Sequence, residues 1–190
     1  MDNKIILCIY LIRKKLYNDR ERMVKMKKEI VVINGTGGSG KDTFVSFVKE
    51  VVKVKNFSSI DKVKEIAKMI GWGGNECKTD KDRKFLSDLK KLTTEYNDMS
   101  FRTIKEAIEE FRNSDEEIMF IHIREPEEIE RAVLEFGCKT LLVKRKGYKN
   151  IETNYSDAHV DDYKYDYVIE NDTLEELEKV AREWAKKLVK

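Results

Sequence analysis

The sequence has little proline, few cysteines and no excess of either charge. Its 190 residues include a single proline, Pro126, and no low-complexity linker. The three cysteines, Cys8, Cys77 and Cys138, lack the spacing of a zinc site and leave an odd thiol, which is typical of a reduced, cytoplasmic protein. At this length we expect one sizeable core, with room for a second unit only as an insertion.

Charged residues are abundant but balanced, with 38 Lys and Arg against 36 Asp and Glu and a formal net charge of +2. No segment carries a sustained basic stripe, so charge does not indicate a nucleic-acid partner. The apolar run at residues 4–13 is too short to span a bilayer, and no small-residue cleavage site follows it. A membrane-surface anchor is the competing interpretation of this run. We expect no membrane partner.

The chain is organised around a glycine-rich stretch that follows four β-branched residues in a row. Gly35-x-x-x-x-Gly40-Lys41 fits the phosphate-binding loop, or Walker A motif, except that Asp42 stands where Ser or Thr is usual and Thr43 follows it. Glycines let consecutive backbone N–H groups turn toward an anion, and a helix N-terminus adds further unpaired donors. The motif predicts a nucleoside-triphosphate site. The alternative is a glycine-rich turn that only joins a strand to a helix.

Apolar periodicity predicts strands that alternate with helices. We therefore predict a three-layer α/β/α fold with a five-stranded parallel sheet, of the P-loop NTPase, nucleotide kinase-like type. The predicted strands are Glu29–Asn34, Val52–Phe57, Glu117–Ile123, Thr140–Val143 and Tyr165–Ile169. The predicted helices are Lys41–Val52, Lys62–Ile70, Asp80–Tyr96, Ser100–Phe111, Pro126–Phe136 and one after Thr173.

Capping residues precede three of these helices. Ser59 or Asp61 is a candidate cap for the second helix, and Thr79 or Asp80 begins the third. Thr173-x-x-Glu176 has the spacing of a capping box for the last helix.

Four sequence-distant segments are expected to lie near the glycine-rich stretch, because ligands of an open parallel sheet bind at the carboxyl ends of its strands. Most of these segments carry ionisable groups suited to phosphates or a metal ion, and phosphoryl transfer chiefly requires positioning and charge neutralisation. The segments are Ser58–Asp61, His122–Glu125, Lys144–Lys146 and Glu170–Thr173.

Three motifs between residues 29 and 190 resemble the nucleoside monophosphate kinase group of P-loop proteins, and most narrowly the phage-type deoxynucleoside monophosphate kinases. They are Gly-Lys-Asp-Thr at 40–43, Ile123-Arg124-Glu125-Pro126, and the segment Tyr167–Leu174 before the last helix. The loop motif is highly specific for nucleotide binding, and the other two are moderately specific for the family.

The resemblance implies roles for individual residues on the donor side. Lys41 and the backbone of the loop hold the phosphates of ATP, Arg124 contacts a phosphate, and Arg145 belongs to a lid over about residues 145–164. Asn171 and Thr173 border the donor base. The implied ATP-binding residues are Gly35, Gly37, Gly38, Ser39, Gly40, Lys41, Asp42, Thr43, Asn171 and Thr173.

On the acceptor side, the resemblance implies a helical insertion over about residues 58–115 that binds the second substrate. Candidate contacts there are Ser59, Asp61, Arg83 and Arg102, together with Arg124. Surface arginines on charged helices are often merely solvated, which is the alternative for Arg83 and Arg102.

Magnesium is the expected metal ion. The family tends to carry an Asp where this chain has His122, so the candidate ligands are Asp42 and Thr43, with Asp61 or water as alternatives. Related kinases begin a few residues before the first strand, which makes Met23 or Met26 a natural start. We therefore expect residues 1–25 to lie outside the fold and residues 26–190 to form one domain.

These observations predict a cytoplasmic, Mg²⁺-dependent kinase that transfers the γ-phosphoryl group of ATP to a nucleoside or deoxynucleoside monophosphate. Dephospho-coenzyme A kinase is the enzymatic alternative, with Asp61 as a candidate base, and other small-molecule P-loop kinases belong to the same class. The non-enzymatic alternative is a regulatory module whose bound nucleotide sets its conformation. The sequence does not specify the accepted base or sugar, or the oligomeric state.

Overall fold

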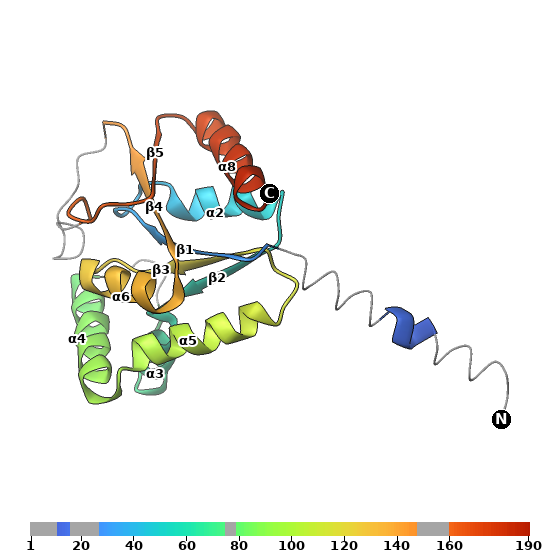
Figure 1. The fold of residues 1–190 in the computed structure, drawn as a ribbon. Coiled ribbons are helices and arrows are strands. Elements are labelled where there is room, and N and C mark those ends of the chain that lie inside the picture. Colours follow the sequence, from blue (N-terminus) through green and yellow to red (C-terminus); the bar gives the residue numbers. More distant parts are fainter. Residues whose placement is uncertain (1–10, 16–26, 75–78, 148–159) are drawn as a thin grey trace, which may run out of the picture.

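The computed structural model describes residues 11–15, 27–74, 79–147 and 160–190. The described part is an α/β domain in which strands and helices alternate (Figure 1). Its strands are β1 (Glu29–Asn34), β2 (Val54–Ser58), β3 (Ile118–His122), β4 (Lys139–Arg145) and β5 (Tyr167–Asn171). Its main helices are α2 (Lys41–Lys49), α3 (Asp61–Met69), α4 (Asp80–Asn97), α5 (Met99–Arg112), α6 (Pro126–Phe136) and α8 (Leu174–Leu188).

The five strands form one parallel sheet in the order β2-β3-β1-β4-β5, which confirms the predicted five-stranded parallel sheet. β1 is the central strand, and its side chains from Val31 to Asn34 are buried. β3 is equally apolar and has four buried residues, as expected where helices cover both faces of a parallel sheet. The register aligns Ile33 with His122, so β1 and β3 end at the same edge.

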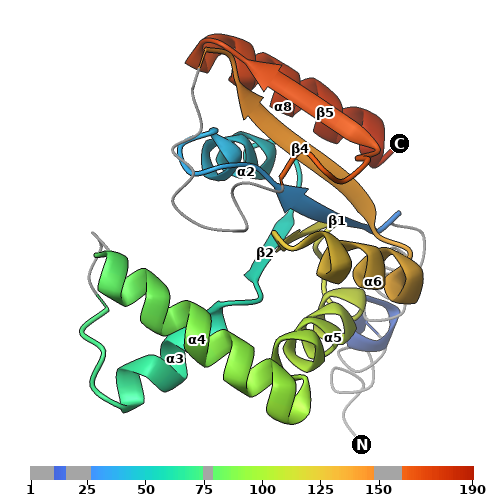
Figure 2. The same ribbon diagram turned by 90° about the vertical axis from the view of Figure 1, so that its left-hand side faces the viewer.

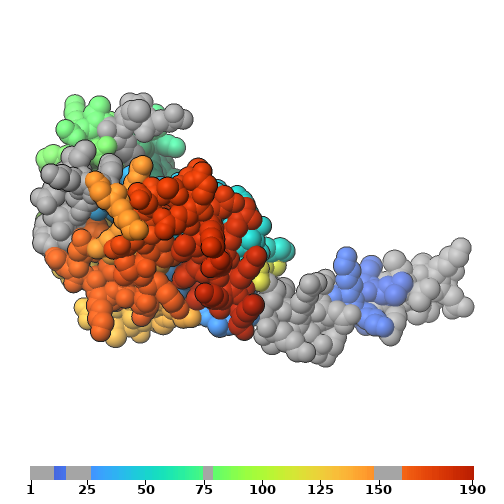
Figure 3. Space-filling view, turned by 90° about the horizontal axis from the view of Figure 1, so that it is seen from above, coloured from blue at the N-terminus to red at the C-terminus, as the bar shows by residue number. Residues whose placement is uncertain are grey.

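Helices cover both faces of the sheet (Figure 1). On one face, α2 and α8 pack on β1, β3 and β4, and the Trp184 ring contacts those of Phe44 and Phe120 at centroid distances of 5.4 and 5.9 Å. On the other face, α5 and α6 contribute residues such as Phe111 and Ile129 to a second buried cluster. Figure 3 shows how residues 160–190 cover much of the molecule on the β5–α8 side.

The helices α3 and α4 form a small core of their own beside the sheet (Figure 2). Val63, Ala67 and Leu86 are its buried residues, and Trp72 packs against them. By contrast, α5 belongs to the layer that covers the sheet, although it lies within the range predicted for the insertion.

Two ionic contacts join α4 to the start and the middle of α6. The Lys90 ammonium lies 2.9 Å from the carboxylates of both Glu125 and Glu128. The Arg131 guanidinium makes two hydrogen bonds to Asp98, in the turn between α4 and α5. The position of α4 relative to the carboxyl end of β3 is therefore set by polar contacts rather than by apolar packing alone.

Most element boundaries agree with the sequence prediction to within one residue, and four elements differ by more; one of them is β2, which begins at Val54 rather than Val52. α2 ends at Lys49, because the chain leaves the helix for β2. β4 extends to Arg145, since it pairs with β5 as far as Asn171, and β5 begins at Tyr167 rather than Tyr165.

The capping predictions are confirmed in part. Thr79 caps α4 in a full capping box with Asp82. The hydroxyl of Thr173 accepts the Glu176 N–H, but the Glu176 carboxylate accepts from the N–H of Asp172, one residue before the cap. The prediction that Ser59 or Asp61 caps α3 is wrong, because the N-cap position falls on Ile60, which has no side chain to accept a hydrogen bond.

Of the predicted N-terminal extension, the structure describes residues 11–15, a short helical stretch with exposed side chains. Among the helices described, none has the length and apolarity needed to cross a membrane.

Substituting Lys90 with methionine should destabilise the protein, because it leaves two carboxylates close together and largely buried. Burial opposes the charge of Lys90, but its two carboxylates outweigh this effect and raise its pKa. We expect a loss of about 2–4 kcal/mol at neutral pH, measured by urea unfolding. Lys91→Met is the matched control, because the Lys91 ammonium is exposed and lies 3.8 Å from Glu95.

The pH dependence of this loss distinguishes it from a packing effect. Burial works against ionisation of Glu125, yet the attraction of Lys90 dominates and lowers the pKa of Glu125. The lowered pKa stabilises the folded protein at pH values above the pKa of the unfolded state, and this stabilisation is lost on acidification. Without Lys90, burial raises the pKa of both carboxyls, so protonation restores stability as the pH falls. The difference from wild type should therefore shrink between pH 7 and roughly pH 5. A difference that is constant with pH contradicts this account.

Candidate functional site

The candidate site lies at the carboxyl edge of the sheet, where β1 and β3 end side by side. The helix after β1, α2, packs on one face of the sheet, and the helix after β3, α6, packs on the other. Two neighbouring strands whose connections leave in opposite directions form a topological switch point, which is where open α/β sheets bind ligands. The glycine-rich loop, residues 35–40, begins at this point.

The conformation of the loop requires glycine at several positions. Gly35, Gly38 and Gly40 all have positive φ angles, of 155°, 78° and 93°. A Cβ atom on Gly35 would lie 2.5 Å from both the Ser39 hydroxyl oxygen and the Val143 carbonyl oxygen. The loop therefore turns back closely over the end of β4, and an L side chain at position 35 has no space.

A buried asparagine, Asn34, fixes the start of the loop. Its side-chain oxygen accepts the N–H of Gly35 at 2.8 Å. Its amide nitrogen donates to the Arg124 carbonyl at 3.2 Å and to the Tyr165 hydroxyl at 2.8 Å. Tyr165 in turn donates to the Val160 carbonyl, and burial raises the pKa of this hydroxyl to about 12, so it keeps its proton. Three separate segments thus meet at one side chain.

A second buried asparagine, Asn171 at the end of β5, fixes the other end of the loop. Its amide donates to the carbonyl oxygens of Ser39 at 3.1 Å and of Lys144 at 2.6 Å. The resemblance assigns Asn171 to the border of the donor base, but in the structure its amide nitrogen is engaged with the backbone. Thr173 is exposed and caps α8.

The N-terminus of α2 faces the loop without a side-chain cap. Gly40 occupies the N-cap position in a left-handed conformation, so it offers no side-chain acceptor. The first turn holds Lys41, Asp42 and Thr43. Uncapped N–H groups and the positive end of the helix dipole favour an anion at this point.

The electrostatics of His122 show which ionisable groups gather around the site. Burial lowers its pKa, and the charges that act on it belong to Asp42, Lys41, Asp61 and Arg124, in decreasing order. The structure therefore brings together four charged residues that the sequence singled out. His122 itself makes a hydrogen bond of 2.8 Å between its Nε2 and the Asn56 side chain, as expected for a structural histidine.

The other predicted acceptor-side residues differ in their placement. Ser59 is buried, and its hydroxyl donates to the His122 carbonyl at 3.4 Å, so it links the ends of β2 and β3. Asp61 is exposed and forms an ion pair of 2.7 Å with Lys64. Arg83 and Arg102 are exposed on the first turns of α4 and α5, and within the described residues neither makes a side-chain hydrogen bond or ion pair.

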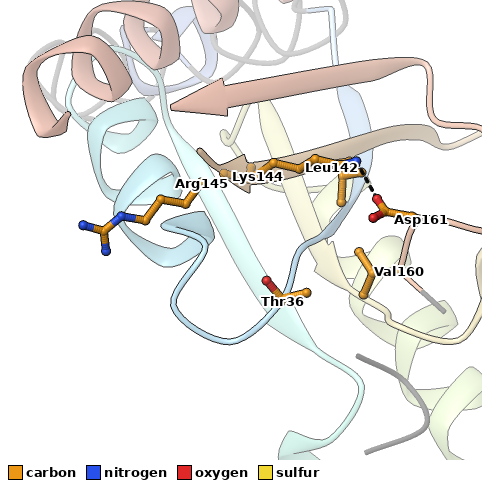
Figure 4. A pocket seen from close by; sticks show the side chains of 7 residues that line it. Thr36, Leu142, Lys144, Arg145, Val160 and Asp161 are labelled. Carbon is orange, nitrogen blue, oxygen red and sulfur yellow. Dashed lines mark ion pairs between the residues drawn. The ribbon is translucent and has the colours of Figure 1, made fainter. Parts of the chain in front are cut away.

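A cavity of about 170 Å³ lies between the loop, β4 and residues 160–161 (Figure 4). Thr36 contributes from the loop, and Lys144 forms an ion pair of 2.5 Å with Asp161. Arg145, with which the predicted lid begins, is the last residue of β4 and is exposed. The central part of the predicted lid, residues 148–159, lies outside the described residues.

No group of three or more His, Cys, Asp or Glu side chains is arranged to hold a metal ion in the described part of the chain. Asp42 and Thr43, the predicted magnesium ligands, are adjacent on the first turn of α2, with Asp42 exposed and Thr43 half-buried.

Sequence reasoning missed Asn34, Tyr165 and Lys90. A polar residue that ends an apolar strand just before a glycine was the available signal for Asn34. Nothing local marks Tyr165, which is 131 residues away from Asn34, or Lys90, whose partners lie on another helix.

Comparison with known proteins identifies the fold only. No protein-family model matches the sequence, and no curated protein matches it. The crystal structure of TT1252 from Thermus thermophilus is similar, with a TM-score of 0.51 and 19% sequence identity over 86% of this chain and 100% of that chain. At this identity the likeness supports the α/β fold and carries no information about activity.

Replacing Gly35 with alanine should destabilise the protein, because the new methyl group would overlap Ser39 and Val143. We expect a loss of about 1–3 kcal/mol in the free energy of unfolding. Gly37→Ala is the control, since a Cβ there has no neighbour within 4 Å. Equal stability of the two variants contradicts the described loop conformation.

The imidazole of His122 should titrate below its ordinary pKa of 6.5, because burial disfavours the charged ring. The chain has two histidines, so ¹H–¹³C NMR of the ring protons resolves both, and His122→Gln assigns the signal. A midpoint for His122 at or above 6.5 would show that the ring is solvated or that nearby carboxylates dominate.

Proposed function

We propose that the protein is an ATP-dependent kinase that phosphorylates a small phosphorylated acceptor, most specifically a nucleoside or deoxynucleoside monophosphate. One observation carries the proposal: a glycine-rich loop at the switch point of a parallel sheet leads into an uncapped helix N-terminus that begins with Lys41. This combination is suited to a polyphosphate, because it joins the N–H groups of an uncapped helix N-terminus, the helix dipole and a lysine in one place.

The residues gathered at the edge of the sheet suit phosphoryl transfer. In this reaction an oxygen of the acceptor phosphate attacks the γ-phosphorus of ATP, the bond from that phosphorus to the β–γ bridging oxygen breaks, and ADP leaves. Lys41 would hold the outer phosphates of the donor, and Arg124, two residues after the end of β3, would hold a phosphate between donor and acceptor. Such contacts accelerate the reaction by fixing the reactants and neutralising charge in the transition state.

The acceptor would lie between the sheet and the α3–α4 unit. Ser59 and Asp61 border this side, and the ion pair of Lys90 with Glu125 holds α4 against the residue that follows Arg124 in the sequence. The bidentate geometry of an arginine side chain suits an acceptor phosphate better than a lysine would.

Magnesium would accompany the nucleotide. Mg²⁺ keeps several waters and binds through one or two protein groups plus substrate phosphates, so a site without a dedicated carboxylate cage is compatible with it. The hydroxyl of Thr43 and the carboxylate of Asp42 are the groups of the first turn of α2 that could hold it. The ion would neutralise charge on the transferring phosphoryl group.

The proposal is tested by measuring ADP release from Mg-ATP by the full chain. The acceptor panel consists of ribo- and deoxynucleoside monophosphates together with dephospho-coenzyme A. We expect turnover with one or a few monophosphates, and a loss of about 100-fold or more in Lys41→Met, because a charge-neutralising contact is removed. Lys49→Met, at the other end of α2, is the matched control.

If only dephospho-coenzyme A supports turnover, the acceptor group is a hydroxyl and not the phosphate of a monophosphate. Binding of ATP without turnover on any acceptor would contradict the kinase proposal and favour a regulatory nucleotide-binding module. Equal activity of Lys41→Met and Lys49→Met would show that the glycine-rich loop and Lys41 do not bind the phosphates of ATP.

A further inference from the structure

Lys144 and Arg145 are neighbours in sequence but point in opposite directions (Figure 4). Successive side chains of a strand alternate between the two faces of the sheet, and β4 continues through both residues. In Figure 4 the Lys144 ammonium reaches toward Asp161, on the same side as Val160, whereas the Arg145 guanidinium extends in the opposite direction. Both residues line the cavity beside the glycine-rich loop, but of the two cations it is the Lys144 ammonium that lies next to Asp161 there.

The main chain of Lys144 is tied to the loop. The Asn171 amide bridges the carbonyl oxygens of Lys144 and Ser39, so the end of β4 and the loop are held at a fixed separation. The close approach of Gly35 to the Val143 carbonyl fixes the same separation one residue earlier. A cation at position 144 is thus positioned relative to the loop backbone by two independent contacts.

The ion pair with Asp161 is weak enough to be exchanged. The side chains of Lys144 and Asp161 are 39% and 60% exposed, and solvent screening reduces such pairs to a small net stabilisation. A phosphate group offers more negative charge and more acceptor oxygens than one carboxylate, so it competes favourably for the ammonium.

Asp161 is not required to hold its own segment in place. Val160 is buried, and its carbonyl accepts a hydrogen bond of 3.0 Å from Tyr165, which is itself bonded to Asn34. Residues 160–165 therefore have a separate anchor on the core. The Lys144–Asp161 pair lines a cavity rather than closing a packing gap.

We infer that Lys144, rather than Arg145, is a phosphate-binding cation of this site, and that Asp161 is its counter-ion until a phosphate group enters the cavity beside Thr36. This inference rests on the proposed function, because it assigns the occupant of the cavity as part of a polyphosphate bound by the loop. Binding transfers the Lys144 ammonium from the Asp161 carboxylate to a phosphate oxygen. No covalent bond changes in this step.

The test measures the affinity of the full chain for inorganic triphosphate and for Mg-ATP by calorimetry. Lys144→Met should weaken binding of both probes by about 10-fold or more, the effect of losing a charge-assisted hydrogen bond. Asp161→Asn should strengthen binding by roughly 2- to 5-fold, because it removes the competitor for Lys144. In the double variant, the Asp161→Asn gain should disappear.

Lys139→Met is the matched control, because Lys139 lies at the opposite end of β4 and forms a similar ion pair of 3.2 Å with Glu29. If Lys144→Met does not fold, Lys144→Gln takes its place. The affinity of Asp161→Asn for the two probes can be compared with that of wild type even if neither Lys144 variant folds. An Arg145→Met variant that loses more affinity than Lys144→Met overturns the inference. The inference is also overturned if Asp161→Asn strengthens binding equally when Lys144 is already replaced. It is overturned as well if Lys144→Met and Asp161→Asn each weaken binding.

The two proposals fail in different ways. If wild type binds Mg-ATP in a Lys41-dependent manner while Lys144→Met binds equally well, the inference is wrong and the proposed function stands. If wild type binds neither probe, the proposed function is wrong and the inference falls with it.

Discussion

Two buried asparagine side chains hold the glycine-rich loop, and the geometry of the candidate site depends on them. Asn34 and Asn171 are 1% and 5% exposed, and both bond main-chain groups that neither helix nor sheet pairing would satisfy. A buried backbone group without a partner costs about 1–3 kcal/mol, so each amide stabilises a conformation that the chain would otherwise avoid. The loop can therefore keep its positive-φ glycines without help from a ligand.

The same contacts explain how distant segments come to share one site. Asn34 reaches the ends of β1 and β3 and the Tyr165 segment, and Asn171 reaches the loop and β4. The charges that meet there are of both signs, because Lys41 and Arg124 lie near Asp42 and Asp61 around His122. Under the proposed function, a polyphosphate that enters this nearly charge-balanced site would replace internal ionic partners, so its affinity would depend on each individual ion pair.

The sequence was sufficient for the fold because the main signals were local. Four β-branched residues before the loop identified β1, and the continuous apolar run of β3 identified a strand buried on both faces. Pro126 and Gly137 marked the two ends of α6 correctly. The helix α5 was harder to assign, since its amphipathic pattern does not reveal whether it packs on the sheet or on α4.

The location of the candidate site could be predicted from a sequence motif, whereas the contacts within it, which depend on tertiary packing, could not. The loop and the strand ends followed from sequence and from the general rule for parallel sheets, and the structure brings these segments together. The orientation of Lys144 and Arg145 depended on how far β4 continues, which is set by pairing with β5. The role of Asn171 as a backbone clamp required a contact across 132 residues, and no local pattern encodes such a contact.

The central claim is that residues 35–43 hold the triphosphate of a nucleotide. It is tested most directly by ¹H–¹⁵N NMR of the full chain during titration with Mg-ATP, with adenosine as the probe that lacks phosphates. The account predicts that the amides of the loop and of the first turn of α2 shift with Mg-ATP and not with adenosine, because the phosphates accept their hydrogen bonds. Saturable shifts elsewhere in the protein, with these amides unchanged, would contradict it.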